Sequence, residues 1–133
     1  MANRGTADNS LGRQSICVVD DDVSIRSALV ALMRSMKFKA RGFASGEEFL
    51  ASRGTASAGC LILDIRMKGM SGLELQSKLA AEGIRIPIIF VSAHADTETR
   101  DRAMRAGALA VFSKPFSAEA LIECVHRALR IEV

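Results

Sequence analysis

Four short apolar runs in this chain each end in polar residues, and this pattern constrains the fold most strongly. Each run is followed by apolar residues at helical spacing, which is typical of buried strands in a parallel sheet. In open parallel sheets the chemistry gathers just beyond the carboxyl ends of the strands, so these polar residues should meet in one pocket. The runs and their polar ends are 16–19 before Asp20, Asp21 and Asp22; 60–63 before Asp64; 88–91 before Ser92; and 109–113 before Lys114.

A fifth strand and five helices complete the predicted fold. Residues 38–43 predict a short second strand whose basic side chains suit a sheet edge, where charge discourages the addition of further strands. Strands that alternate with helices predict an α/β fold, a doubly wound parallel sheet covered on both faces. With the second strand at an edge, the flavodoxin-like (CheY-like) order 2-1-3-4-5 fits best.

Local signals predict several helix boundaries. Asp22 is a predicted N-cap, because its side chain can accept a hydrogen bond from the first turn of the helix that follows. Capping boxes are predicted at Ser45 and Ser71, each with Glu three residues later. Residues 53–59 are expected to form a small, flexible loop.

The helix predicted at 97–106 differs from the others. Its apolar stripe is thin and consists mainly of Ala103, Met104 and Ala106. A helix that is anchored so weakly is a candidate for movement or for docking. Its arginines, Arg100 among them, alternate with acidic residues, so we expect them to face solvent or a partner.

Length and composition fit one domain. The chain has 133 residues, of which 49% are hydrophobic, and a net charge of +3 that is too small to argue for nucleic-acid binding. No run approaches the roughly 18 apolar residues of a membrane span. We expect residues 1–14 to be a disordered tail and residues 15–133 to be the domain. Cys17, Cys60 and Cys124 are expected to be buried, reduced thiols in a cytosolic protein.

The predicted pocket combines a cation site with a nucleophile. Asp20, Asp21 and Asp64 should lie close together, and packed carboxylates repel one another unless a cation neutralises them. Ligands that are all oxygen favour Mg²⁺ and argue against zinc. Asp64 can accept a phosphoryl group as an acyl phosphate, while the Ser92 hydroxyl and the Lys114 ammonium bind its oxygens. Taken singly, each of these residues has an ordinary interpretation as a cap, a turn residue or a surface charge; their joint placement favours the functional one.

Over residues 15–130 the sequence resembles the receiver domain of two-component response regulators, in particular receivers of the FixJ type. The pattern is specific because it combines several motifs in a fixed order. The matching stretches are 18–21, 63–67, 69–72, 91–94 and 113–116.

The resemblance implies a phosphoacceptor and a metal site. It makes Asp64 the residue that receives a phosphoryl group from a sensor histidine kinase. It assigns Mg²⁺ to Asp20, Asp21 and Asp64, with the backbone carbonyl of Arg66 as a further ligand. Ser92 would be the switch hydroxyl and Lys114 the basic partner. Arg66 and His94 occupy positions that tune the lifetime of the phosphoryl group in the family.

The resemblance also implies how the protein acts. Such a chain is not an enzyme in the usual sense, but a cytoplasmic phosphoacceptor with intrinsic, Mg²⁺-dependent autophosphorylation and autodephosphorylation. Its phosphorylation would change the face built by the fourth helix, fifth strand and fifth helix, and that face would support a homodimer. The output would be a partner or a DNA-binding module that regulates transcription, with no direct contact of this chain with nucleic acid or membrane.

Two positions depart from the family pattern. Val111 stands where an aromatic residue is usual, and the neighbouring Phe112 should point to the opposite face of its strand. We therefore expect an output switch that depends less on an aromatic side chain. Lys68 stands where Pro is usual, which frees the backbone and adds a cation near the pocket.

Two other functions suit a similar fold. A flavodoxin-like mononucleotide binder would want a glycine- or hydroxyl-rich first loop, whereas this loop carries three aspartates, 20–22. A phosphatase of the haloacid-dehalogenase kind would carry its nucleophile after the first strand rather than at Asp64. Substitution of Asp64 distinguishes these alternatives.

Overall fold

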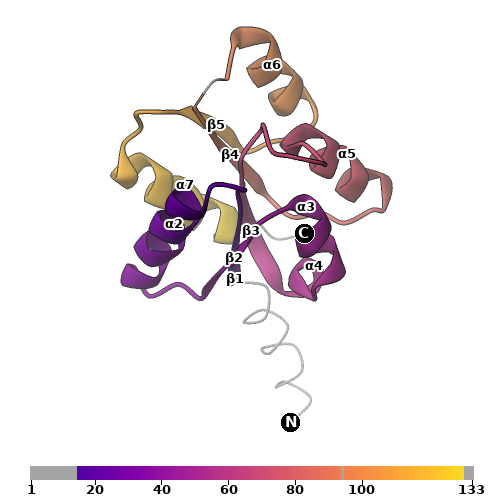
Figure 1. The fold of residues 1–133 in the computed structure, drawn as a ribbon. Coiled ribbons are helices and arrows are strands. Elements are labelled where there is room, and N and C mark those ends of the chain that lie inside the picture. Colours follow the sequence, from indigo (N-terminus) through magenta and orange to yellow (C-terminus); the bar gives the residue numbers. More distant parts are fainter. Residues whose placement is uncertain (1–14, 94, 131–133) are drawn as a thin grey trace.

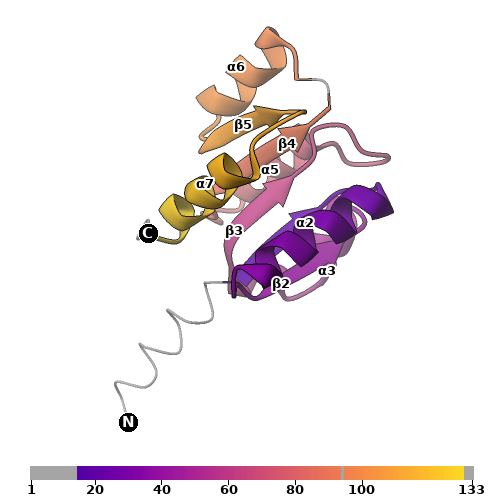
Figure 2. The same ribbon diagram turned by 90° about the vertical axis from the view of Figure 1, so that its left-hand side faces the viewer.

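The computed structural model describes residues 15–93 and 95–130. Their five strands form one parallel sheet in the order β2-β1-β3-β4-β5, with helices on both faces (Figures 1 and 2). The predicted fold class and strand order are confirmed. The predicted tail at 1–14 lies outside the described residues. The elements are β1 Ser15–Val19, α2 Val23–Ser35, β2 Ala40–Phe43, α3 Gly46–Ala51, α4 Gly54–Ser57, β3 Ala58–Leu63, α5 Gly72–Ala81, β4 Ile88–Ser92, α6 Thr97–Arg105, β5 Ala110–Ser113 and α7 Ala118–Arg130.

The described residues contain six helices, one more than the sequence predicted. The additional helix, α4, is a single turn inside the segment expected to be a flexible loop. Ser52 organises it: its hydroxyl donates to the Phe49 carbonyl (2.6 Å) and accepts from the Gly54 N–H (2.9 Å). A Cβ on Gly54 would lie 2.7 Å from the Phe49 ring, so glycine lets the chain turn closely over that side chain.

The second strand is shorter than predicted. It begins at Ala40 rather than at residue 38, because Phe38 still lies in the turn that closes the end of α2. The Phe38 N–H donates to the Met33 carbonyl (3.1 Å), and Lys37 adopts a left-handed φ of 73° in the turn. This arrangement satisfies carbonyls at the helix end that would otherwise lack a partner.

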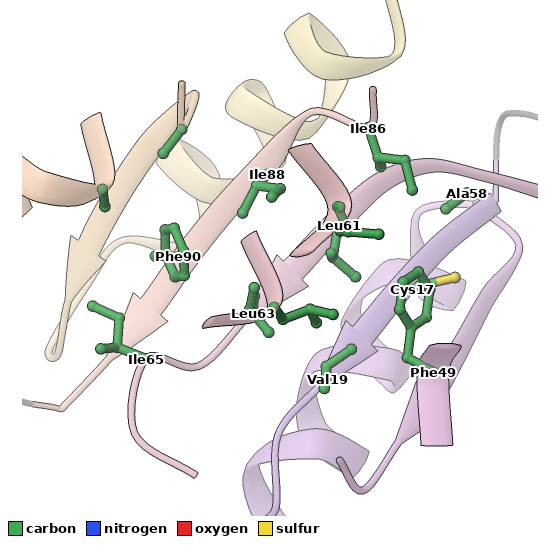
Figure 3. Packing of buried hydrophobic residues seen from close by; sticks show 14 of the residues in the cluster. Cys17, Val19, Phe49, Ala58, Leu61, Leu63, Ile65, Ile86, Ile88 and Phe90 are labelled. Atoms are coloured by element: carbon green, nitrogen blue, oxygen red, sulfur yellow. The ribbon is translucent and has the colours of Figure 1, made fainter. Parts of the chain in front are cut away.

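The core lies on both faces of the sheet, which explains why the strand sequences are apolar without alternation. On one face, Leu61 and Leu63 of β3 pack with Phe49 of α3 (Figure 3), in a cluster that extends to α5 and α6. On the other face, Ile62 packs in a cluster with residues of α2 and α7, including Leu29. The three cysteines are free and buried, as expected. Among the described helices, none is long and apolar enough to cross a membrane.

The helix N-termini mostly follow the predicted caps. Asp22 accepts from the N–H groups of Ser24 and Ile25, and Ser71 forms a complete capping box with Glu74. At Ser45 only half of the predicted box is present. The Ser45 hydroxyl accepts from the third residue of the helix, but the Glu48 carboxylate turns to the N–H of Ala44 (2.7 Å). The glutamate therefore ties the loop before the helix rather than the cap residue itself.

Candidate functional site

The carboxyl ends of β1, β3, β4 and β5 meet at one pocket of about 150 Å³. Asp20, Asp64, Arg66, Ser92 and Lys114 all line it, so the sheet brings together the residues that the sequence pattern singled out. Asp21 is exposed beside them rather than part of the pocket wall. The pocket is small and opens to solvent, which suits a small polar group better than a nucleotide.

Asp20 is the most deeply placed of the carboxylates, with 3% of its surface exposed. The Asp22 N–H donates to its Oδ1 (2.9 Å), and the Arg26 guanidinium donates to its backbone carbonyl (2.8 Å). Burial raises its pKa from 3.8 to about 6, and the nearby charges of Asp64 and Asp21 add to the rise, while the bond from Asp22 opposes it. In the metal-free protein the surroundings of Asp20 therefore disfavour the ionised form of its carboxyl group.

Asp64 follows the central strand β3 and is partly buried. Its N–H donates to the Val19 carbonyl (3.0 Å), which continues the β1–β3 pairing to the edge of the pocket. Burial also raises the pKa of the Asp64 carboxyl, and the charge of Asp21 adds to this. The N–H groups of Ile65 and Arg66 and the Ser92 hydroxyl oppose the rise by donating hydrogen bonds to the carboxylate.

Gly72, the first residue of α5, packs directly against the backbone of Asp64. A Cβ at this position would lie 2.1 Å from the Asp64 carbonyl oxygen, closer than real Cβ contacts allow. The Gly72 N–H donates to the Ile65 carbonyl (2.8 Å). The absence of a side chain thus lets α5 begin close behind Asp64 and fix its backbone.

The acidic residues are arranged as a hard cation would require. One oxygen from each of Asp20, Asp21 and Asp64 can be chosen so that all three lie within 4.8 Å of one another. An all-oxygen donor set suits Mg²⁺, and a cation would remove the cost of the raised pKa at Asp20. Arg66 also lines the pocket, which places it beside these carboxylates.

Lys68 contacts the site through its backbone. Its N–H donates to Oδ2 of Asp21 (3.0 Å) and so holds one oxygen of that carboxylate. Proline has no N–H and could not make this bond. The sequence pointed to this position because Lys68 stands where Pro is usual. The hydrogen bond itself could not be predicted, because it depends on the path of the loop between β3 and α5.

Ser92 and Lys114 come from adjacent strands. Ser92 is buried at the end of β4 and pairs in register with Ser113 of β5. The Lys114 N–H donates to the Ser92 carbonyl (3.2 Å), so the backbones that carry the hydroxyl and the ammonium are fixed relative to each other. Ala93, next to Ser92, is exposed and lines the pocket, and its small side chain adds little bulk there.

The helix α6 is held differently from the prediction. Ala103 is fully buried, but Met104 is 45% exposed and Ala106 is exposed, so the apolar stripe is thinner still. Arg100, expected to face solvent or a partner, is half-buried and donates to Val111 and Ser113 of β5. Sequence reasoning missed this role because alternating charges usually indicate a solvated face.

Fold and site together define a class: doubly wound α/β domains with an acidic pocket at the carboxyl edge of a five-stranded parallel sheet. The model of one family, the response regulator receiver domain, matches residues 16–126. The chain belongs to this family. Membership of this family favours a receiver over the mononucleotide binder and the phosphatase that the sequence alone left open.

Relatives with known names agree with this assignment. The chain is 44% identical over 128 residues to the response regulator protein TmoT of Ectopseudomonas mendocina, covering 91% of this chain and 58% of TmoT. It is 37% identical over 117 residues to the transcriptional regulatory protein TdiR of Thauera aromatica, covering 88% of this chain and 52% of TdiR. The chain thus spans between half and three fifths of these curated relatives.

Solved structures show the same architecture. The response regulator StyR has a TM-score of 0.81 and 44% identity, with 87% of this chain and 59% of StyR covered. The crystal structure of FixJ-N has a TM-score of 0.82 and 34% identity, with 90% of this chain and 95% of that chain covered. The likeness to receivers of the FixJ type is confirmed at the level of the fold.

Proposed function

We propose that this receiver domain accepts a phosphoryl group on Asp64 from a sensor histidine kinase. The observation that carries the proposal is the convergence of Asp64, Ser92 and Lys114 in one small pocket beside Asp20 and Asp21. These groups supply a nucleophile, a hydroxyl, an ammonium and an acidic cation site. All of them lie around a single pocket in which one phosphoryl group can bind.

In the proposed transfer, a carboxylate oxygen of Asp64 attacks the phosphorus of a phosphohistidine on the kinase. The O–P bond forms while the N–P bond breaks, and the histidine nitrogen keeps the electron pair of the broken bond. The Lys114 ammonium and the Ser92 hydroxyl bind oxygens of the transferred group. Asp64 must be ionised to attack, so the hydrogen bonds that oppose the rise in its pKa favour the reactive form.

We propose Mg²⁺ as the cofactor, held by Asp20, Asp21 and Asp64 with the Arg66 backbone carbonyl as a further ligand. When bound, the ion neutralises negative charge on the phosphoryl oxygens. The Lys68 N–H orients Asp21 toward this role by holding its other oxygen.

The wider role follows from the same proposal. Residues 15–133 act as the receiver, which is not an enzyme for an external substrate but phosphorylates itself from small donors and loses the group again with Mg²⁺. Phosphorylation changes the output face, defined as α6, β5 and α7, which supports a homodimer. We place the protein in the cytoplasm, where its free thiols stay reduced, and its output in transcription, as the name of TdiR suggests for that relative. We expect no direct binding of this chain to nucleic acid or membrane.

The test is intact mass after incubation with acetyl phosphate, with and without Mg²⁺. We expect a gain of one phosphoryl group in the wild type that requires Mg²⁺ and is lost in Asp64→Asn. Asp22→Asn is the matched control, because it removes a nearby carboxylate but keeps a capable N-cap, and it should still be labelled. Labelling that persists in Asp64→Asn would overturn the assignment of the acceptor.

A further inference from the structure

The helix α6 is attached to the domain mainly by polar contacts. Ala103 is its one buried residue. On the side of α5, the buried Gln76 amide donates to the Ala103 carbonyl (3.1 Å). The side chain of Met104, the large apolar residue of this helix, is 45% exposed. Few apolar contacts therefore oppose a movement of this helix, and its hydrogen bonds matter more than usual.

On the side of β5, the attachment is made by Arg100. One guanidinium nitrogen donates to the Val111 carbonyl (2.6 Å), and the other donates to the Ser113 hydroxyl (2.8 Å). Both acceptors are on β5, so the planar guanidinium spans two residues of the strand at once. Such charge-assisted, two-point bonds are stronger and more directional than single neutral ones.

The bonded stretch of β5 leads directly to the pocket, because Lys114, the residue after β5, lines it. Ser113 pairs in register with Ser92, and the next residue, Lys114, donates from its backbone to Ser92. A displacement of Ser92 or Lys114 toward a group on Asp64 therefore also moves Ser113, the last residue of β5, to which Arg100 donates. The contacts form an unbroken path from the pocket to α6.

We propose that Arg100 is a positioning residue that couples the phosphoryl pocket to α6 through its two bonds to β5. The proposal rests on the proposed function of Asp64 and adds the means by which its state reaches the output face. Arg100 binds the backbone carbonyl of Val111 itself, so coupling at this face requires no aromatic ring at that position. In the unmodified protein the two bonds hold α6 on β5; a shift of the β5 end breaks or rearranges them and frees the helix.

The test is hydrogen exchange of the α6 amides in the full chain, with and without beryllofluoride and Mg²⁺ as a mimic of the phosphoryl group. The variants are Arg100→Ala, Arg100→Lys, which keeps the charge but loses the two-point geometry, and Arg102→Ala. Arg102 is exposed on the same helix and is the matched control. Acetyl phosphate labelling of Asp64 is measured on each variant by mass.

Without beryllofluoride, we expect α6 to exchange roughly tenfold faster in Arg100→Ala than in wild type, in line with the loss of hydrogen bonds from a charged group. Arg100→Lys should resemble Arg100→Ala, and Arg102→Ala should resemble wild type. Beryllofluoride should speed exchange of α6 in the wild type and leave it nearly unchanged in Arg100→Ala, although Asp64 is still labelled.

Two results would overturn the proposal. Equal exchange of α6 in Arg100→Ala and Arg102→Ala would show that the bonds do not hold the helix. Faster exchange in Arg100→Ala with a full response to beryllofluoride would show a structural role without coupling. A wild type that acetyl phosphate does not label at Asp64 would instead contradict the proposed function, and the basal exchange would still decide whether Arg100 holds α6.

Discussion

The carboxylates of the pocket differ in how the surrounding chain holds them. Asp20 is buried and receives a hydrogen bond from its own loop, whereas Asp21 is exposed and is held by the N–H of Lys68 from the loop after β3. A divalent ion would join these groups, and its binding should depend both on their protonation and on their orientation.

Binding of Mg²⁺ should weaken as the pH falls through about 6. The pKa of Asp20 is raised from 3.8 to about 6, so its folded, metal-free form holds a proton that the cation must displace. We expect the apparent affinity, measured by calorimetry, to fall about tenfold per pH unit below 6. An affinity that is the same at pH 5 and pH 7 would contradict this.

The same shift has a consequence for stability without metal. Because the folded pKa of Asp20 lies above the unfolded one, its contribution favours the folded state below about pH 4 and is lost as the pH rises to about 6. Asp20→Asn should therefore raise the urea midpoint of the metal-free protein at pH 7. The matched Asp22→Asn should leave that midpoint nearly unchanged.

Lys68→Pro should weaken Mg²⁺ binding roughly tenfold, which is typical when a partner that orients a metal ligand is removed. The substitution deletes the N–H that donates to Asp21. Lys68→Ala is the control, because it removes the ammonium but keeps the N–H, and we expect near-normal affinity by calorimetry. Equal losses in both variants would mean that the side chain, rather than the backbone, acts on the site.

At the scale of elements, the approach of α5 to β3 depends on Gly72. We expect Gly72→Ala to lower the free energy of unfolding by about 3 kcal/mol in urea titrations, because the added methyl meets the Asp64 backbone rather than a flexible side chain. Gly83→Ala, with a left-handed φ of 73° and open space around it, should cost only about 1 kcal/mol. Similar losses in the two variants would show that close packing is not the cause.

The elements also show how far sequence reasoning reaches. The β3 strand and its pairing were predictable because burial on both faces leaves a continuous apolar run, as in 60–63. The α4 turn was not, because it depends on the Ser52 hydroxyl and on the fit of Gly54 against a ring, which are tertiary contacts without a periodic signal. The site residues followed from the topology, since every strand end faces the same edge. The role of Arg100 could not be predicted in this way, because its hydrogen-bond acceptors lie on another element, β5.

At the scale of the whole molecule, we expect beryllofluoride with Mg²⁺ to convert the 14.3 kDa chain to a dimer in sedimentation velocity. Met104→Glu should prevent this, because it places a charge on the exposed apolar surface of α6. Met36→Glu is the matched control: that methionine is 42% exposed at the end of α2, away from the output face, and its variant should still dimerise. Dimers in both variants would place the interface elsewhere.

The order of the strands along the chain determines at which point of synthesis the pocket can be complete. The acidic residues follow β1 and β3, whereas the ammonium follows β5, so the pocket is complete only after Asp20 and Lys114, about seven tenths of the chain apart, have come together. A chain still on the ribosome that ends before residue 110 has its aspartates but lacks Lys114. On the proposed function, competence to accept a phosphoryl group therefore requires synthesis to pass Lys114, and a nascent chain that ends before it would have the acidic residues without the ammonium.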